Sequence, residues 1–472
     1  NTTRPTASIS GTTQNVKCGD NATVTVTLTG TGPWSGTLSD GTSFSTSTSP
    51  VNVTVNPTGN TVYTISNIND INFNNVTSNL GGTPVSVNIT TSVWKGTVSS
   101  SWEDPANWCG GAVPSSTNNI TIPNVANLPV ISANTNSVKD ITIETGANLT
   151  INDGGKLSVT GNFSLNGLIT NNGTLSFEGS GSQVFSGTTP GLISMDSIEV
   201  NKTGGGILLN KNITVTGALI PTSGSITLNN DTIILASSSS NTAFVGNATN
   251  ASFNYATSGK FIVERYIPTG VNHSKSWQLL SASTFGQTIK EAWMEGATSS
   301  NANPKQGYGT QTVGNGGWTN GFDLTSSLPS IKTYNPSNDT WVGVPSTNTA
   351  VNNVNGYMIF VRGDRGVVNY NDPSAPTTLR CTGKIYSPSN PPGAVVIPAG
   401  KFQTIGNPYA SAIDFINLSN ANPGIDKYFY VWDPLFSGTY GGYRIFSLSN
   451  NWDDGQNTIN YSGVNTLIQS GQ

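Results

Sequence analysis

Residues 141–165 read ITIETGANLTINDGGKLSVTGNFSL, and this stretch decides how the middle of the chain folds. A triplet with an apolar residue at its first and last position recurs in it, and a Gly or Asn follows each triplet closely. Short strands that end at such turn residues are typical of a β-solenoid, in which each turn of chain stacks on the one before. Further triplets are Leu175-Ser176-Phe177, Ile198-Glu199-Val200, Ile213-Thr214-Val215, Ile226-Thr227-Leu228 and Ile233-Ile234-Leu235.

In a solenoid, the two outer residues of each triplet point inward and the middle residue faces water. An antiparallel sandwich is the alternative, because it also alternates apolar and polar side chains. The triplets are short for hairpin strands, which favours the solenoid. We therefore expect residues 92–260 to form a β-solenoid similar to a parallel β-helix.

The composition of all 472 residues predicts an all-β protein with many turns. Charged residues make up only 9% of the chain, against about a quarter in an average soluble domain. Asn, Thr, Ser and Gly take their place, and these residues are poor helix formers. The length exceeds what one core usually organises, so we expect two to four domains.

The charge balance excludes some partners. The formal net charge is −4 and the pI is near 5.0, without a basic stripe that would bind nucleic acid. No run approaches the roughly 20 apolar residues that cross a bilayer, so we expect no membrane span. Together with the polar, weakly charged composition, this predicts an exported, extracellular protein.

The sequences on either side of residues 92–260 predict β-sandwich domains. Residues 1–91 contain alternating runs such as Val24-Thr25-Val26-Thr27-Leu28, which indicate an immunoglobulin-like β-sandwich. Residues 261–472 are richer in aromatic and charged residues and predict a β-sandwich or jelly-roll domain with one or two short helices. Helices are expected at 287–296 and 413–418, and strands at 356–361, 394–397 and 428–432.

Cys18, Cys109 and Cys381 lie far apart and show no zinc-site spacing. One disulfide with one free thiol and three buried, inert thiols are the two alternatives, and the sequence leaves both open.

Distinctive sequence blocks follow one another in residues 92–260 (region two) and 261–472 (region three). Region two opens with Val93-Trp94-Lys95-Gly96 and continues through Asn107-Trp108 to Val113-Pro114. The blocks of region three are Glu264-Arg265-Tyr266-Ile267-Pro268, Trp277-Gln278-Leu279-Leu280-Ser281, Trp293-Met294-Glu295-Gly296, Gly307-Tyr308-Gly309-Thr310, Gly356-Tyr357-Met358, Phe360-Val361-Arg362-Gly363-Asp364-Arg365, Ile405-Gly406-Asn407-Pro408-Tyr409 and Tyr430-Val431-Trp432-Asp433-Pro434.

In the same order, these blocks resemble large type IX-secreted surface proteins and adhesins of Bacteroidota. The resemblance implies a segment of a secreted cell-surface adhesin or filamentous surface protein, with the type IX secretion machinery as a partner and glycans or other surface polymers as candidate ligands. Such modules also occur in gliding-motility proteins. The family pattern continues beyond residue 472, so we expect the third domain to be truncated. The alternative function is a non-catalytic, carbohydrate-binding accessory region of an exported polysaccharide-degrading enzyme, and a third is a fibre subunit.

The resemblance also suggests modification sites. Asp196-Ser197-Ile198 and Asp231-Thr232-Ile233 match the Asp-Ser/Thr-aliphatic pattern at which Bacteroidota O-glycosylate exported proteins. Ser197 and Thr232 are therefore candidate O-glycosylation sites.

No residue pattern predicts catalysis, a cofactor or a firm metal site, so we expect a protein that is not an enzyme. His273 is the single histidine, and the sequence shows no nucleophile or carboxylate partner that would make it a general base. Arg362-Gly363-Asp364 spells an integrin-type tripeptide, but we expect its Arg and Asp to form structural ion pairs. Glu103-Asp104 and Asp453-Asp454 leave Ca²⁺ as a candidate ligand, without an EF-hand loop. Sugar stacking is a candidate role for Trp34, Trp94, Trp102, Trp108, Trp318, Trp341 and Trp452 if they are exposed, and a core position is the alternative.

Overall fold

The computed structural model describes residues 3–269, 275–300, 302–436, 440–450, 467–468 and 470. It confirms the all-β class: most elements are strands, and the described α-helices are two short ones. The chain divides into two compact units, residues 1–175 with 186–189, and residues 176–185 with 190–472. Among the described residues no helix has the length and apolar character to span a membrane.

The N-terminal part of the first unit contains two sheets around one core. Alternation in β3 buries Val24 and Val26 fully and leaves the hydroxyl-bearing neighbours outside. The core also takes in Leu38 of β4 and Tyr63 of β7. One sheet has the order β6-β3-β1-β9 and the other β5-β4-β8, with bounds β1 (Ala7–Ser10), β3 (Ala22–Leu28), β4 (Trp34–Leu38), β5 (Ser43–Thr46), β6 (Val51–Val55), β7 (Thr61–Tyr63), β8 (Ile65–Asn69) and β9 (Leu80–Gly82).

Strand β10 (Val85–Val93) connects this core to the next set of strands. Its first half pairs antiparallel with β7, and it also pairs in parallel with β2 (Gln14–Lys17). Its last residues pair in parallel with β11 (Asn119–Ile122). Backbone hydrogen bonding is therefore continuous from the N-terminal core into the middle region.

The middle region of the first unit is a stack of short parallel strands. Ile120 pairs with Ile141, and Ile141 with Phe163, so each turn of chain places an apolar residue on the previous one. All three side chains are buried, as the outer positions of the triplets require. The strands are β11, β12 (Val130–Ile131), β13 (Thr135–Val138), β14 (Ile141–Ile143), β15 (Asn148–Ile151), β16 (Lys156–Val159) and β17 (Phe163–Leu165).

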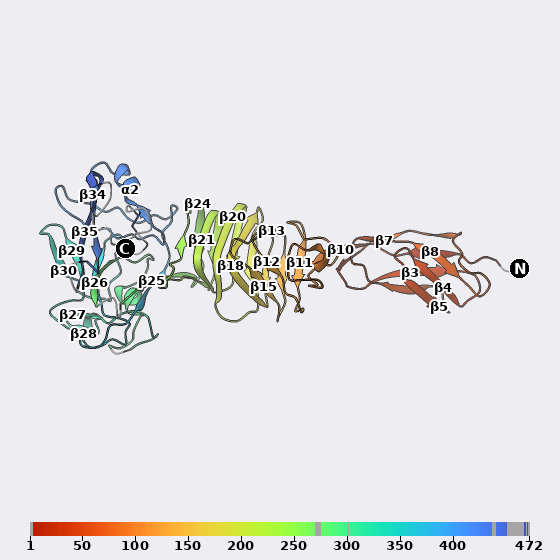
Figure 1. The fold of residues 1–472 in the computed structure, drawn as a ribbon, viewed down its shortest axis with the longest axis horizontal. Coiled ribbons are helices and arrows are strands. Elements are labelled where there is room, and N and C mark those ends of the chain that lie inside the picture. The colour runs from red at the N-terminus through yellow and green to blue at the C-terminus, as the bar shows by residue number, and fades with distance from the viewer. Residues whose placement is uncertain are drawn as a thin grey trace. The chain divides into compact units, whose positions relative to one another are not determined.

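The second unit contains a parallel stack of the same kind. Ile193 pairs with Ile213, Ile213 with Ile233, and Ile233 with Phe261. Strands β20, β21 and β24 lie side by side in Figure 1. The bounds are β18 (Leu168–Gly179), β19 (Gln183–Ser186), β20 (Ile193–Leu209), β21 (Ile213–Leu228), β22 (Thr232–Leu235), β23 (Phe244–Val245), β24 (Asn250–Tyr255) and β25 (Lys260–Ile267). Strands β18 and β19 have residues in both units. We use the name parallel stack for the parallel-paired strands among β11 to β25, each unit taken by itself; the solenoid path remains a prediction.

The middle residue of a triplet does not always face water, and there the sequence-based expectation was wrong. Thr142 and Ser164 are partly exposed, but Ser158, Ser176 and Ile234 are buried. The buried Ser176 hydroxyl needs no water as a partner, because carboxylate oxygens of Glu178 and Glu199 lie within hydrogen-bond distance of it.

Turn glycines allow the turns to lie close together. A Cβ on Gly173 would lie 2.3 Å from the carbonyl oxygen of Gly155, and one on Gly167 would lie 2.3 Å from that of Glu144. Any side chain at these positions would push adjacent turns apart. Gly167 and Gly173 are therefore required by close backbone contact.

The C-terminal region of the second unit begins where β25 pairs antiparallel with β32 (Thr377–Gly383). A four-stranded sheet follows with the order β26-β31-β29-β30, and its inner face packs on Trp293 and Ile289 of α1. The sheet strands are β26 (Ser276–Leu280), β29 (Ile331–Asn335), β30 (Thr340–Gly343) and β31 (Tyr357–Val361).

The expected helix at 287–296 is present but shorter: α1 spans Ile289–Trp293. Thr288 starts it through a capping box with Glu291. It stops because Glu295 and Gly296 both have left-handed backbone angles, with φ of 55° and 59°. Ile289, Ala292 and Trp293 are buried as predicted.

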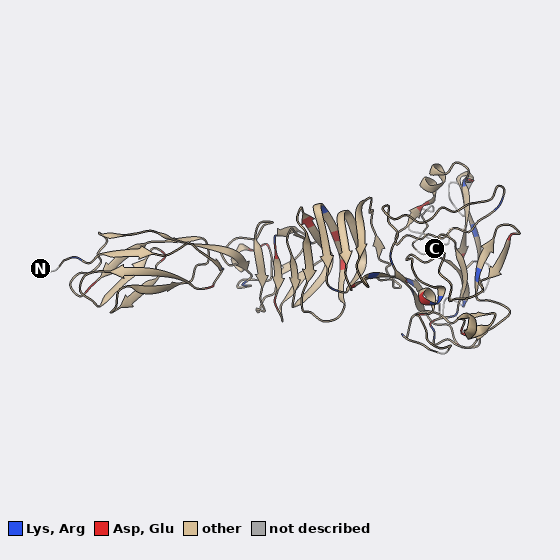
Figure 2. Ribbon diagram, turned by 180° about the vertical axis from the view of Figure 1, so that it is seen from behind, with Lys and Arg blue, Asp and Glu red and all other residues tan. Residues whose placement is uncertain are grey.

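The second expected helix is α2 (Phe415–Ala421), which packs with the hairpin of β34 (Tyr428–Asp433) and β35 (Gly442–Ser447). The strand expected at 394–397 is absent, and that prediction was wrong. Prolines at 391, 392 and 398 remove backbone donors around it, and Val396 is 81% exposed. Figure 2 shows how few charged residues lie on the strands of either unit.

Candidate functional site

Three of the tryptophans considered for sugar stacking form a closed core instead. Trp94, Trp102 and Trp108 are fully buried, and Trp108 meets both other rings edge to face at centroid distances of 5.0 and 4.8 Å. The Trp94 indole nitrogen donates to the carbonyl of Asn127 at 2.7 Å. A Cβ on Gly96 would lie 2.1 Å from that same carbonyl oxygen, which explains the Trp-x-Gly opening. No ligand can reach these rings.

Asn107 completes this core. Its side-chain oxygen accepts from the backbone N–H groups of Val98 and Ser99, both at 3.0 Å. Its side-chain nitrogen donates to the Ser99 hydroxyl and the Ser101 carbonyl. Because every hydrogen-bonding group of this buried amide has a partner, the amide holds the loop between Trp94 and Trp108 in one conformation. The Asn-Trp pair is therefore structural.

The cysteines adopt the first of the two alternatives. Cys18 and Cys109 form a disulfide that joins positions 91 residues apart, and Cys381 is free and buried. Burial raises the pKa of the Cys381 thiol to about 12, so this thiol is protonated and unreactive near neutral pH. The disulfide links the loop after β2 to the loop after the tryptophan core.

Arg362-Gly363-Asp364 is built into the fold. Arg362 is half-buried and donates to the backbone carbonyl of Gln311 at 3.3 Å. The Asp364 carboxylate accepts from the backbone N–H groups of Gly307 and Gly366. The ion pair in this block belongs to the next residue: Arg365 meets Asp323 at 2.7 Å, and both side chains are fully buried. An integrin-like role for the tripeptide has no support in this geometry.

The acidic pair at 103–104 also has structural partners. The Glu103 carboxylate accepts from the side chains of Asn136 and Ser101, and Asp104 caps a short 3₁₀ helix by accepting from Ala106 N–H. Among the described residues no three of His, Cys, Asp and Glu gather as a metal site would need. His273, Trp452 and Asp453-Asp454 lie outside the described residues.

A groove of about 270 Å³ lies in the first unit beside the disulfide. Its lining is composed of apolar, hydroxyl and amide side chains and glycine, among them Asn60, Thr90 and Asn118. Cys109 is the one lining residue that could titrate, and it is tied in the disulfide. The groove therefore offers hydrogen bonds but no acid or base.

The two candidate O-glycosylation sites lie on strands of the second unit. Ser197 in β20 is partly exposed, and its hydroxyl donates to the adjacent Asp196 carboxylate at 2.8 Å. Thr232 begins β22, is partly exposed, and donates its backbone N–H to Asn212. Burial raises the pKa of the neighbouring Asp231, while the nearby Lys211 acts against this rise. The two sites lie on different strands, and each remains a prediction of its own.

The β34–β35 hairpin carries an aromatic surface that was not predicted from the sequence. Alternation along the hairpin sends Phe429, Val431 and Phe446 into the core with α2. The opposite side chains face outward, and Phe402 lies against them. We define the aromatic face by its six side chains, of which Trp432 is partly exposed and the others range from 36% to 50% exposure: Phe402, Tyr428, Tyr430, Trp432, Tyr443 and Ile445.

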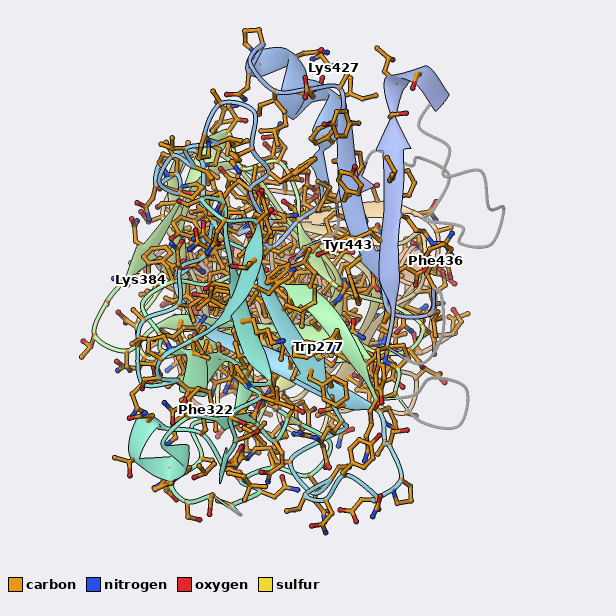
Figure 3. The ribbon with its side chains drawn as sticks, turned by 90° about the vertical axis from the view of Figure 1, so that its left-hand side faces the viewer. Trp277, Phe322, Lys384, Lys427, Phe436 and Tyr443 are labelled. Atoms are coloured by element: carbon orange, nitrogen blue, oxygen red, sulfur yellow. A yellow bond between two sulfur atoms is a disulfide. The ribbon has the colours of Figure 1, made fainter. Side chains whose placement is uncertain are left out.

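Ring contacts run without a break through the aromatic face. Phe402 meets Tyr430 at a centroid distance of 5.5 Å, Tyr430 meets Tyr443 at 6.2 Å, and Tyr443 meets Trp432 at 4.9 Å. All three contacts are edge to face, a favourable arrangement that fixes each ring. The Trp432 indole donates to the backbone carbonyl of Trp277 at 2.8 Å, which anchors the hairpin to β26. Figure 3 labels Trp277 and, on the hairpin, Tyr443.

Charged groups beside the aromatic face compensate one another. Lys401 donates to Asp339 at 3.0 Å, and this contact, assisted by the Tyr334 hydroxyl, lowers the pKa of the Asp339 carboxyl. Arg444 and Asp433 pair at 2.6 Å beneath the hairpin, where both are buried. These two pairs add no net charge to the surface, which offers rings and phenol hydroxyls. Asp426 beside Tyr428 and Lys332 over the Trp277 ring are further charges, of opposite sign.

The sequence did hold a signal for this face. The run Tyr428-Phe429-Tyr430-Val431-Trp432 places aromatic rings on both sides of one strand, which is compatible with rings that lie outside the core. Position alone could not show that Phe402 would join this face, or that the Trp341 indole would donate to Tyr443.

In a comparison with known families, residues 93–204 match the model of a domain of unknown function (DUF8693). The matched segment contains the tryptophan core and much of the parallel stack. Neither the curated proteins nor the solved structures give a match to this chain.

Proposed function

We propose that this chain is a stiff spacer and adhesive module of a secreted cell-surface protein, of the type IX-secreted kind that it resembles. The observation that carries the proposal is the parallel stack. Each turn hydrogen-bonds to its neighbours through backbone ladders and packs an apolar residue on the turn before it. Such an arrangement resists bending and suits a module that holds a binding surface away from a cell.

The covalent and electrostatic features support an extracellular role. The Cys18–Cys109 disulfide forms and persists in an oxidising compartment. Charged residues are only 9% of the chain, so changes in external salt or pH alter few of its interactions. The described titratable groups mostly cap turns or form ion pairs, which gives no reason to assign a reaction.

The alternative is a carbohydrate-binding accessory region of an exported polysaccharide-degrading enzyme. The aromatic face favours this candidate, since exposed rings in a row are a common way to hold sugars. Both candidates place the chain outside the cell, and they differ in what carries it.

An immunoblot of fractionated source cells and medium, with antibody against residues 1–472, tests the proposal. A surface-bound band far larger than 49.2 kDa is expected, and cells that lack the gene should attach less to surfaces. A band free in the medium, with normal attachment of the mutant cells, would support the enzyme-associated alternative.

A further inference from the structure

We infer that the aromatic face binds a neutral polysaccharide chain. The inference rests on the proposed adhesive function and names its ligand class. It starts from the juxtaposition of Phe402, Tyr430, Tyr443 and Trp432, whose rings touch in series and remain accessible.

The chemistry of the face matches a sugar. A pyranose ring has one apolar face of C–H groups and a rim of hydroxyls, so it needs aromatic area and hydrogen-bond partners at once. The face supplies both, because its tyrosines end in phenol groups that can donate and accept. The Tyr443 oxygen already accepts from the Trp341 indole at 3.2 Å, which leaves its own hydrogen free to donate outward.

Charge decides which polymer fits. The Lys401–Asp339 pair at the edge and the buried Arg444–Asp433 pair are each internally neutral. Two further charges near the face have opposite signs, because Asp426 hydrogen-bonds to Tyr428 and the Lys332 amino group lies 4.7 Å from the centre of the Trp277 ring. An anionic polymer such as nucleic acid or a uronic-acid chain would find no cluster of cations here to offset its own charge. A neutral chain incurs no such electrostatic cost, so it complements this face best.

Rigidity adds to the case. Edge-to-face contacts hold the rings, and the Trp432–Trp277 hydrogen bond at 2.8 Å fixes the hairpin on β26. Side chains that are ordered before binding lose little entropy on binding.

The test is affinity electrophoresis of residues 1–472 in native gels that contain a soluble neutral polysaccharide (hydroxyethyl cellulose, xyloglucan, galactomannan or laminarin), with alginate as the anionic comparison. We expect retardation by at least one neutral polymer and none by alginate. Tyr430→Ala with Tyr443→Ala should weaken binding about tenfold or more, as loss of a central aromatic contact does. Tyr430→Phe with Tyr443→Phe keeps the rings and should retain part of the affinity.

Phe244→Ala is the matched control, because Phe244 is 47% exposed but lies in β23, outside the face. Far-UV circular dichroism checks that every variant is folded. Lack of retardation by all neutral polymers, or equal loss with Phe244→Ala, would overturn the inference. Sedimentation that shows self-association abolished by the tyrosine variants would also overturn it, since the occupant would then be a second copy.

Failure here and failure of the proposed function are separable. A chain that binds no polysaccharide but still makes coated beads adhere to plain surfaces retains the adhesive function and loses the glycan inference. A chain that binds a neutral polysaccharide but belongs to a protein free in the medium retains the inference and loses the cell-surface proposal.

Discussion

In the parallel stack, buried polar side chains are mostly uncharged, such as Ser158, Asn171 and Ser176, whereas in the C-terminal region they include the ion pairs Arg365–Asp323 and Arg444–Asp433. A stack repeats its environment at each turn, so backbone ladders satisfy most polar groups there. The C-terminal region has no such repeat and holds its loops with specific side-chain pairs. One region therefore depends on backbone shape, and the other on individual charges.

The largest effect should come from breaking the buried pair of the C-terminal region. Arg365→Met leaves the Asp323 carboxylate buried without its partner and should lower the free energy of unfolding of this region by about 3–5 kcal/mol. Urea denaturation followed by circular dichroism measures the loss. Asp323→Leu together with Arg365→Met should recover part of it, and a single variant as stable as wild type would show that the pair is not needed.

A second test concerns the covalent link in the first unit. Cys109→Ser removes the disulfide between positions 91 residues apart and should destabilise that unit by about 2–4 kcal/mol. Thermal unfolding of the wild type with and without a reductant should reproduce the difference. Cys381→Ala keeps the disulfide and serves as the control; a reductant that leaves the wild-type transition unchanged would contradict the prediction.

Backbone shape in the stack is tested at a turn. Gly173→Ala places a Cβ 2.3 Å from the Gly155 carbonyl oxygen and 2.4 Å from that of Asn152, so adjacent turns must separate. We expect a loss of about 1–3 kcal/mol in the free energy of unfolding. Gly81→Ala, where a Cβ meets nothing within 4 Å, should change stability little. Equal effects of the two substitutions would show that turn spacing does not limit the stack.

The smallest expected effect concerns a charge inside the stack. Lys202 is 3% exposed and donates to the Glu178 carbonyl and the Gln183 side-chain oxygen, and burial lowers its pKa from 10.5. Its charged form is thus less favourable in the folded chain than in the unfolded one. That penalty is complete below the folded pKa and disappears as pH rises from the folded pKa toward about 10.5.

Hydrogen exchange of β20, measured for wild type and Lys202→Met at pH 7 and pH 9.5, tests this. The protection of the wild type relative to the variant should increase at the higher pH. A difference that stays constant, or falls as pH rises, would contradict the assigned direction of the pKa shift.

The all-β class and many strands could be predicted from the sequence, because a strand with one buried side alternates apolar and polar residues along the chain. Ile141, Phe163 and Ile213 were assigned inward on that basis, and all three are buried. Prediction was wrong where a tertiary partner decided the outcome. Ser176 can be buried because the carboxylates of Glu178 and Glu199 lie within hydrogen-bond distance of its hydroxyl. The strand expected at 394–397 has no partner strand.

The candidate site was harder to predict, since it depends on contacts between distant segments. A tryptophan in a β-protein can be core or surface, and Trp94 and Trp341 look alike in the sequence although one is fully buried and the other partly exposed. The aromatic face needed the pairing of β34 with β35 and the approach of Phe402. No local pattern records that approach.

The register of the parallel stack also affects how such a protein can change over generations. Equivalent positions of successive strands pair with one another, and apolar residues stand at the same places in each strand, as Ile193, Ile213 and Ile233 show. A duplication or deletion of one whole turn would therefore leave every remaining side chain on its original face. Genetic events of that size would change the number of strands in the ladder while residues 1–91 and 261–472 keep their sequences, so the ladder and any binding surface of the C-terminal region could evolve independently.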